Sequence, residues 1–363
     1  MNAHFNKASE LYQEGLVDEA VKELKRSIDL EPGEIKPYLT LAAIYEARGQ
    51  NEEAIGVYRK AIHIDMDDSR ANLRLGVILT HLKRYEDALT PLRMAWSNDR
   101  YNARAANALA RALDESGDYS TAQIMYEEVL KLDSGFAEAR FNLATLRFNE
   151  HRYESAITEF VKYMAKAGES SKAHRNIGKA LVQLGQLDSA IGSFNTAASL
   201  DPSDPTIYFN LGLAYNCRDD YETAFENYRH ALVLDPHYVE ARYTLAKALK
   251  DTGHTAESLA EYELVLQEFP NHHRAMNGLA TCCLAQHDSE RALELLGRAI
   301  SQAPESALAH YNLGLALNNL EQFDEALHHF QEASRLDPSD NFPHQATFSR
   351  LLSGNMSYRL SAA

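Results

Sequence analysis

The sequence predicts an all-α fold, an α-solenoid of ten stacked helix–turn–helix units followed by a C-terminal capping helix. The first observation behind this is a period of 34 residues that runs without a slip from Met1 to Asp340. The second is that repeat position 20, counted from the start of each unit, is alanine in nine of the ten units. The third is that position 32 is proline in six of them. Such a period is typical of two-helix repeats, since one unit cannot bury its apolar face alone.

Small residues mark where the two helices of a unit approach each other. Position 8 is always alanine or glycine, and position 20 departs from alanine only at Ser258. Antiparallel helices come close where such small side chains face each other, and large side chains fill the space beside them. We expect the large side chains at positions 7, 11 and 24. Position 24 carries Tyr58, Tyr126, Phe160, Phe194, Tyr228, Tyr262 and Phe330.

Turn residues separate the helices. The first helix of a unit is predicted to end near position 15, where glycine can adopt the left-handed conformation of a helix cap. The glycines at this position are Gly49, Gly117, Gly185 and Gly253. Proline at position 32 follows the second helix and cannot continue it. The segments Asp-Pro-Ser-Asp that begin at Asp201 and Asp337 add turn and N-cap chemistry.

The seventh unit is close to a known repeat consensus. Its segments 208–215, 221–224 and 231–236 read YFNLGLAY, YETA and ALVLDP. With these motifs, and with the register kept over residues 1–340, the chain resembles the tetratricopeptide repeat (TPR) family. The resemblance implies a right-handed superhelix in which the first helices line a concave surface. It also implies a protein that holds other proteins.

The ends of a solenoid need a cover that is apolar inside and polar outside. Beyond the ten tandem repeats of residues 1–340, a capping helix is predicted over residues 341–354. Its apolar side chains and the glycine that ends it are Phe342, Phe348, Leu351, Leu352 and Gly354. Residues 355–363 are polar and are expected to be a mobile tail, with a short docking motif as the alternative.

Two units depart from the pattern. Pro91 falls inside the second helix of the third unit, where it should remove a hydrogen bond and kink the helix. In the fifth unit, Tyr163 occupies a position that is usually small, and an unusual turn follows at 167–171. We hypothesise a change of superhelical pitch or a weak joint near 163–171. Ordinary drift between repeats is the alternative.

Composition excludes several classes of function. The formal net charge of −16 argues against nucleic-acid binding, which depends on neutralising phosphates with basic residues. No window approaches the roughly 20 apolar residues that a membrane span needs. The N-terminus lacks the apolar core of a signal peptide, so a cytoplasmic location is expected.

No catalytic or metal-binding motif is recognisable. The patterns HExxH, GxSxG and the P-loop are absent. Adjacent histidines such as His272 and His273 point about 100° apart on a helix and cannot share a metal ion. The three cysteines have no metal-ligand spacing. We therefore expect no catalytic residue, no metal and no cofactor, and a protein that is not an enzyme.

Positions 2, 5, 6 and 9 of the first helices form one helical stripe, nearly opposite a buried stripe predicted at positions 4, 7, 8 and 11. In the TPR architecture this stripe would face a ligand. Across the ten units it holds ten basic residues and only two acidic ones, Glu138 and Glu240, in a strongly acidic protein. Acidic residues at positions 12 and 13, such as Glu46 and Asp114, would confine the basic character to a band near one edge. Accidental scatter of surface charge is the alternative.

Aromatic and amide side chains accompany the charges. Aromatic residues at position 5 alternate with basic ones in a manner typical of binding hot spots. Asparagine recurs at position 6, where its amide could pair with a peptide backbone, although asparagine is also common there in the family. The residues predicted to contact a partner are Arg70, Arg74, Arg104, Arg111, Phe141, Asn142, Lys172, Arg175, Asn176, Lys179, Phe209, Asn210, Tyr243 and Lys247.

A carboxylate clamp of the kind that binds chaperone C-termini is not expected. Such a clamp needs Lys and Asn at positions 5 and 9, Asn at position 6 of the next repeat, and Lys and Arg at positions 2 and 6 of the third. Arg70 and Arg74 match the last pair, but Phe5, Ser9 and Thr40 do not match the others.

The sequence therefore predicts a non-catalytic scaffold or adaptor whose groove binds a protein or peptide ligand, in the form of an extended and acidic partner segment. Two alternatives stay open. One is a structural scaffold that self-associates through its repeat ends, and the other is a regulatory or targeting subunit of an enzyme complex.

Overall fold

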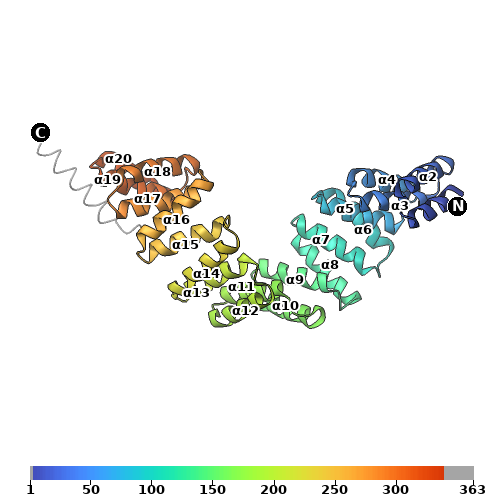
Figure 1. The fold of residues 1–363 in the computed structure, drawn as a ribbon, viewed down its shortest axis with the longest axis horizontal. Coiled ribbons are helices and arrows are strands. Elements are labelled where there is room, and N and C mark those ends of the chain that lie inside the picture. Colours follow the sequence, from blue (N-terminus) through green and yellow to red (C-terminus); the bar gives the residue numbers. More distant parts are fainter. Residues whose placement is uncertain (1–2, 339–363) are drawn as a thin grey trace, which may run out of the picture. The chain divides into compact units, whose positions relative to one another are not determined.

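A computed structural model describes residues 3–338, which form twenty α-helices and no strand. The predicted all-α solenoid is confirmed, while the number of repeats and the handedness of the superhelix stay predictions. The chain divides into two compact units, unit 1 (residues 1–184) and unit 2 (residues 185–363). Within each unit every helix packs against the next one along the chain (Figure 1).

Unit 1 contains eleven of the described helices. They are α1 (Ala3–Gln13), α2 (Val17–Leu30), α3 (Ile35–Ala47), α4 (Asn51–Ile64), α5 (Ser69–His81), α6 (Tyr85–Asn98), α7 (Ala103–Glu115), α8 (Tyr119–Leu132), α9 (Ala137–Asn149), α10 (Tyr153–Ala167) and α11 (Ser171–Gln183). Unit 2 contains the other nine. They are α12 (Leu187–Leu200), α13 (Pro205–Cys217), α14 (Tyr221–Leu234), α15 (Val239–Asp251), α16 (Thr255–Glu268), α17 (His273–Ala285), α18 (Ser289–Gln302), α19 (Ala307–Asn319) and α20 (Phe323–Leu336).

The buried face of the first helices is wider than predicted. Positions 4, 7, 8 and 11 are largely buried, but so are positions 3 and 10, as at Ala105 and Ala112 of α7. The reason is that a first helix contacts the first helices of neighbouring repeats as well as second helices. In unit 1, α7 contacts α5 and α9, and in unit 2, α17 contacts α15 and α19. Small side chains at position 3 allow this close approach.

Position 15 has the left-handed backbone in every repeat, with or without glycine. The predicted glycines have positive φ, for example 70° at Gly49 and 91° at Gly117. Five other residues adopt the same conformation with φ between 59° and 62°: Lys83, His151, Asp219, His287 and Glu321. The residue that follows donates its N–H to the carbonyl five positions earlier, as Arg84 does to Leu79 at 2.8 Å. This bond closes the end of the first helix whether or not glycine is present.

Polar side chains at position 4 bind the loop that precedes their helix. The guanidinium of Arg140 donates to the carbonyl of Ser134 at 2.9 Å, and that of Arg242 donates to the carbonyl of Pro236 at 3.0 Å. The hydroxyl of Tyr38 donates to the carbonyl of Pro32 in the same way, at 3.2 Å. These bonds satisfy loop carbonyls at position 32, and they explain why a partly buried position tolerates polar residues.

The irregular units are accommodated locally. Helix α6 runs as one helix from Tyr85 to Asn98 across the buried Pro91, so the proline does not divide it. In the fifth unit, the ring of Tyr163 packs edge-on against Phe141 with centroids 5.3 Å apart. Helix α10 ends at Ala167, and the division between the units falls after Leu184 rather than at this turn. The weak joint stays a hypothesis. The predicted capping helix and tail lie outside the described residues.

A pair of histidines joins the last two described helices. The Nδ1 atoms of His310 on α19 and His329 on α20 lie 3.0 Å apart, and His310 Nε2 lies 3.1 Å from the carbonyl of Pro304. Because that carbonyl can only accept, His310 donates through Nε2 and accepts through Nδ1 from His329. Burial, together with the nearby His310 and His328, holds the pKa of His329 below its ordinary value of 6.5, against a smaller opposing effect of Glu332.

The lowered pKa predicts a loss of stability in mild acid. Above pH 6.5 both states of the chain hold His329 neutral. As the pH falls, the unfolded chain binds the proton first, so stability declines until the pH passes the lower pKa of the folded state. We expect His329→Gln, whose amide can still donate to His310, to lose less stability than the wild type between about pH 7.5 and about pH 5.5. Thermal unfolding followed by circular dichroism at both pH values measures the difference, and equal losses would contradict the expectation.

Candidate partner-binding surfaces

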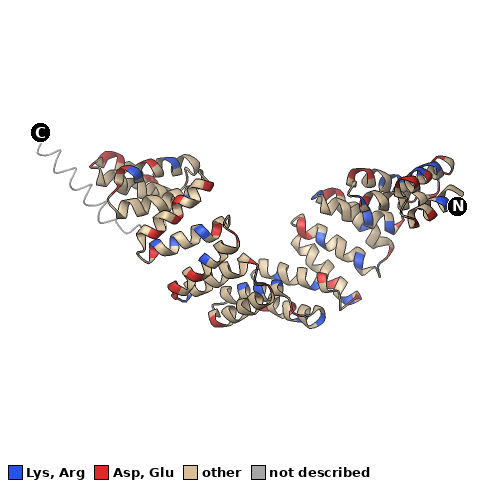
Figure 2. Ribbon diagram, in the orientation of Figure 1, with Lys and Arg blue, Asp and Glu red and all other residues tan. Residues whose placement is uncertain are grey.

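The ten basic residues of the stripe at positions 2, 5, 6 and 9 are all at least partly exposed. Three of them are held in ion pairs: Arg70 with Asp68, Arg74 with Glu46 and Arg111 with Glu138. Six others make no ion pair with any residue in the range 3–338. These are Lys36, Arg104, Lys172, Lys179, Lys247 and Arg274. Their charges are available to a ligand. Figure 2 shows basic and acidic residues along both units.

In unit 1, α3 and α5 enclose a small hollow. Arg70 and Arg74 line it together with Leu39, Thr40, Ala43 and Tyr58, around a volume of about 300 Å³. Glu46 bonds two of these lining residues, because it accepts from Arg74 at 3.3 Å and from the Tyr58 hydroxyl at 3.0 Å. The negative charge of Glu46, at position 12, is thus engaged by Arg74, although its side chain stays 26% exposed.

Phe141 and Asn142 on α9 are half-buried, and both make contacts within unit 1. The Phe141 ring packs edge-on against Phe160, with centroids 5.3 Å apart, as well as against Tyr163. The amide of Asn142 lies near the hydroxyl of Tyr126, whose pKa it helps to lower against the larger effect of burial. One edge of these side chains is therefore committed to the core, and the other stays accessible.

Helix α11 carries the densest group of predicted residues. Lys172 and Lys179 are exposed and lie seven residues apart on one face, with Arg175 and Asn176 half-buried between them. The ammonium of Lys179 lies 5.2 Å from the centre of the Phe148 ring. Burial and the positive charge of Arg175 both lower the pKa of Lys179. An anionic ligand would relieve this repulsion between cations.

The asparagines at repeat position 6 are only partly available to a ligand. In unit 2 the Asn210 amide donates to the carbonyl of Thr206 in its own helix. Asn312 is buried and donates to Asn277 Oδ1 at 3.0 Å, and Tyr311 is buried as well. The interpretation of positions 5 and 6 as groove surface is therefore wrong for the tenth repeat, where both side chains are buried. A peptide-binding asparagine ladder stays a prediction.

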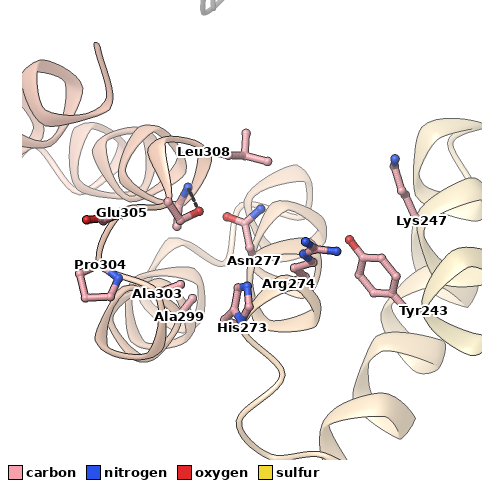
Figure 3. A pocket seen from close by; sticks show the side chains of 12 residues that line it. Tyr243, Lys247, His273, Arg274, Asn277, Ala299, Ala303, Pro304, Glu305 and Leu308 are labelled. Carbon is pink, nitrogen blue, oxygen red and sulfur yellow. Dashed lines mark hydrogen bonds between the residues drawn. The ribbon is translucent and has the colours of Figure 1, made fainter. Parts of the chain in front are cut away.

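A hollow of unit 2 lies where α15, α17 and the start of α19 meet (Figure 3). It has a volume of about 880 Å³. Tyr243 and Lys247, both predicted, line it, while Phe209 lies apart and packs against Tyr228 and Tyr238. Tyr243 is fixed by contacts with Tyr262 and His272, at 6.0 and 5.3 Å between ring centres.

Sequence reasoning missed part of this hollow. His273, Glu305 and Leu308 also line it, together with Arg274 and Asn277. Arg274, Asn277 and Leu308 occupy stripe positions 2 and 5, and the stripe rule could have selected them. His273 at position 1 and Glu305 in the loop before α19 depend on how the helix ends meet, which the stripe rule does not describe.

Between residues 3 and 338, no three or more histidine, cysteine or acidic side chains are grouped so that they could hold a metal ion. Over the same range, no helix combines the length and the apolar character required to cross a bilayer.

Stacked helix pairs with exposed first-helix faces define a class of repeat proteins. The tetratricopeptide repeat profiles match residues 11–112 and 218–310 in overlapping segments, and also 107–172, 178–216 and 307–340. The chain belongs to the tetratricopeptide repeat family. Proteins of this family generally mediate protein–protein interactions.

Among curated proteins, the chain is 24% identical over 309 residues to superkiller complex protein 3 of Homo sapiens. The alignment covers 83% of this chain and 20% of that protein. It is 24% identical over 246 residues to BBSome complex member BBS4 of Bos taurus, which covers 68% of this chain and 47% of the relative. The chain spans about a fifth of the length of the first of these relatives. Both relatives are, by name, members of complexes.

Solved structures share the fold. The C-terminal part of a TPR repeat-containing protein from Cytophaga hutchinsonii is 17% identical, with a TM-score of 0.55 over 66% of this chain and 99% of that one. A tetratricopeptide repeat protein from Parabacteroides merdae is also 17% identical, with a TM-score of 0.52 over 70% and 98%. At this identity the likeness concerns the fold alone.

Proposed function

We propose that this chain is a non-catalytic, cytoplasmic scaffold whose first-helix faces bind an extended, acidic segment of a partner protein. The observation that carries the proposal is the charge of the stripe, which holds ten basic residues and two acidic ones in a chain of net charge −16. Six of these cations make no ion pair within residues 3–338. In unit 1, Lys179 lies beside the ring of Phe148. In unit 2, Lys247 and Arg274 line the same hollow as Tyr243. Cations next to aromatic rings are typical of binding hot spots.

Extended ligands suit the repeat geometry. Neighbouring helices pack about 10 Å apart, and an extended chain advances about 3.3 Å per residue, so each repeat would span about three ligand residues. A segment of a dozen residues would then contact about four repeats, which either unit can supply.

A peptide selection tests the proposal. A phage-displayed library of random peptides, about twelve residues long, would be selected on the full chain, and the affinity of the selected peptides measured by fluorescence anisotropy. We expect peptides rich in Asp and Glu. For peptides that bind unit 1, the double variant Lys172→Glu, Lys179→Glu should weaken binding at least about tenfold, or about 1.4 kcal/mol.

The matched control is Arg59→Glu, Lys60→Glu. These two residues are exposed on the second helix α4 and are in no ion pair within residues 3–338. Because the control changes the net charge by the same amount, it should leave binding unchanged. Selected peptides without acidic residues, or equal loss in both double variants, would contradict the proposal. Light scattering across concentration examines the self-association alternative, since the scaffold should not grow as its concentration rises.

A further inference from the structure

We infer that the hollow between α15, α17 and α19 in unit 2 is a two-part peptide pocket. One part would receive a carboxylate of the partner segment, and the other an apolar side chain about three residues away from it. The inference rests on the proposed function, because its occupant is an extended acidic segment. It goes further by naming the residues, the order of the two ligand groups and their spacing.

The carboxylate part is built from hydrogen-bond donors on two helices. Lys247 of α15 and Arg274 of α17 are exposed and make no ion pair with any residue the structure describes between 3 and 338. Tyr243 adds a hydroxyl on a ring held by Tyr262 and His272. In Figure 3 the hydroxyl of Tyr243 and the guanidinium of Arg274 point toward one another across the space between α15 and α17. Charge-assisted bonds to a carboxylate are the strongest that such donors form.

Asn277 is oriented to donate as well. Its side-chain oxygen accepts a hydrogen bond from the buried Asn312 at 3.0 Å. That bond leaves the NH₂ group of Asn277 for the hollow. The buried Asn312 thus acts as a positioning residue. It fixes the amide so that the side facing the ligand offers donors only, which favours an anion over a cation.

The apolar part lies at the other end of the hollow. Leu308 is 52% exposed at position 2 of α19, and Ala299, Ala303 and Pro304 also line the hollow. Figure 3 shows Pro304 and Glu305 on the side away from Tyr243 and Lys247. Glu305 would repel a second carboxylate there, so the acidic and apolar groups of the ligand could not exchange places.

Equivalent positions set the spacing of the two ligand groups. Arg274 and Leu308 both occupy position 2, on the adjacent first helices α17 and α19, which contact each other. Their separation is therefore the spacing of neighbouring helices, about 10 Å, which an extended peptide covers in about three residues. The arrangement differs from the carboxylate clamp, because Tyr243, Lys247, Gly278, Leu308 and Asn312 stand where a clamp has Lys, Asn, Asn, Lys and Arg.

Synthetic peptides of about twelve residues test the inference on the full chain. The probes, each with a blocked C-terminus and a fluorescent label, come from the selection described above. Each probe carries one Glu with a Leu three residues away. Its affinity is compared with that of three matched peptides: one with Glu→Gln, one with Leu→Ser, and one in which the Glu and the Leu are adjacent. We expect each change in the peptide to weaken binding at least about fivefold. The same peptides with a free C-terminus show whether a terminal carboxylate can replace the side chain.

Variants of the protein assign binding to the pocket. Arg274→Gln and Lys247→Gln should each weaken binding of the Glu peptide about tenfold but leave the Gln peptide unaffected. Leu308→Ser should weaken binding of the Leu peptide and leave binding of the Ser peptide unchanged. Arg59→Gln, Lys60→Gln on the second helix α4, outside the stripe, serves as the control and should have no effect on these probes.

The possible results separate the inference from the proposed function. If peptides bind the wild type but Arg274→Gln, Lys247→Gln and Leu308→Ser change nothing, the pocket is wrong while a scaffold function stands. If the library yields no binding peptide at all, both are wrong. If the terminal carboxylate alone supports binding, the pocket recognises chain ends and the assignment to an internal acidic residue is overturned.

Discussion

Replacing Glu159 by Gln is expected to lower the free energy of unfolding by roughly 3 kcal/mol, at the lower end of what breaking a buried ion pair costs. Glu159 on α10 is 5% exposed. Its carboxylate accepts from Arg140 at 2.8 Å, from Lys162 at 2.9 Å and from Arg147 at 3.2 Å. The side chains of Arg140 and Arg147 are themselves only 13% and 16% exposed. An amide at this point leaves Arg140 and Lys162 without a counter-charge among residues 3–338. Arg147 then keeps only its longer contact with Glu127, at 3.4 Å.

The pH dependence of the effect distinguishes charge from packing. Burial raises the pKa of Glu159, but the hydrogen bonds of Lys162 and Arg140 and the nearby positive charges outweigh it, so the pKa lies below the ordinary 4.5. The stabilisation is therefore present above pH 4.5 and is lost as the pH falls through the lower pKa of the folded state. The difference between wild type and variant should shrink over that range.

Urea unfolding followed by circular dichroism measures the effect. Glu128→Gln is the matched control, because Glu128 pairs with Lys131 one turn away on the exposed surface of α8. Such surface pairs contribute up to about 1 kcal/mol. A loss in Glu159→Gln no larger than in the control would show that solvent screens the cluster and that our account of it is wrong.

The repeat pattern predicted the helices well because their ends are determined locally. Small residues at positions 8 and 20 and the turn residues recur with the period, and the helices follow the same register throughout the described residues. The left-handed position 15 was predicted only where glycine stands. Lys83 and His151 adopt the same conformation, because the hydrogen bonds across the helix end override their own preference.

The candidate surfaces were less predictable, since side-chain partners depend on neighbouring repeats. The stripe rule selected Lys179 and Lys247, which are exposed. It also predicted that Tyr311 and Asn312 lie on the surface, but both are buried. It could not show that Glu46 forms hydrogen bonds with Arg74 and Tyr58, two residues that line a hollow. A period states which residues share a face, whereas the lengths and charges of particular side chains decide which of them stay available.

Tyr126 of α8 belongs to a buried core cluster of unit 1 that also contains Leu109 of α7 and Leu143 of α9. Tyr126→Ala is expected to destabilise the chain most, by roughly 3–5 kcal/mol. Tyr126 is fully buried. Its hydroxyl donates to Asp114 of α7 at 3.2 Å. Truncation therefore leaves a cavity in a core that adjacent repeats share. Because a solenoid is stabilised by interfaces between neighbours, unfolding should lose cooperativity and show two transitions in urea.

Two phenylalanine variants separate the ring from the hydroxyl. Tyr126→Phe removes only the hydroxyl and should cost about 1 kcal/mol, the usual contribution of one hydrogen bond. Tyr228 occupies the same repeat position and is equally buried, but its hydroxyl has no hydrogen-bond partner among residues 3–338. Tyr228→Phe should therefore be neutral or slightly stabilising, since it removes an unsatisfied buried group. If Tyr126→Phe proved as harmless as Tyr228→Phe, the bond to Asp114 would contribute nothing, and the loss in Tyr126→Ala would belong to the cavity alone.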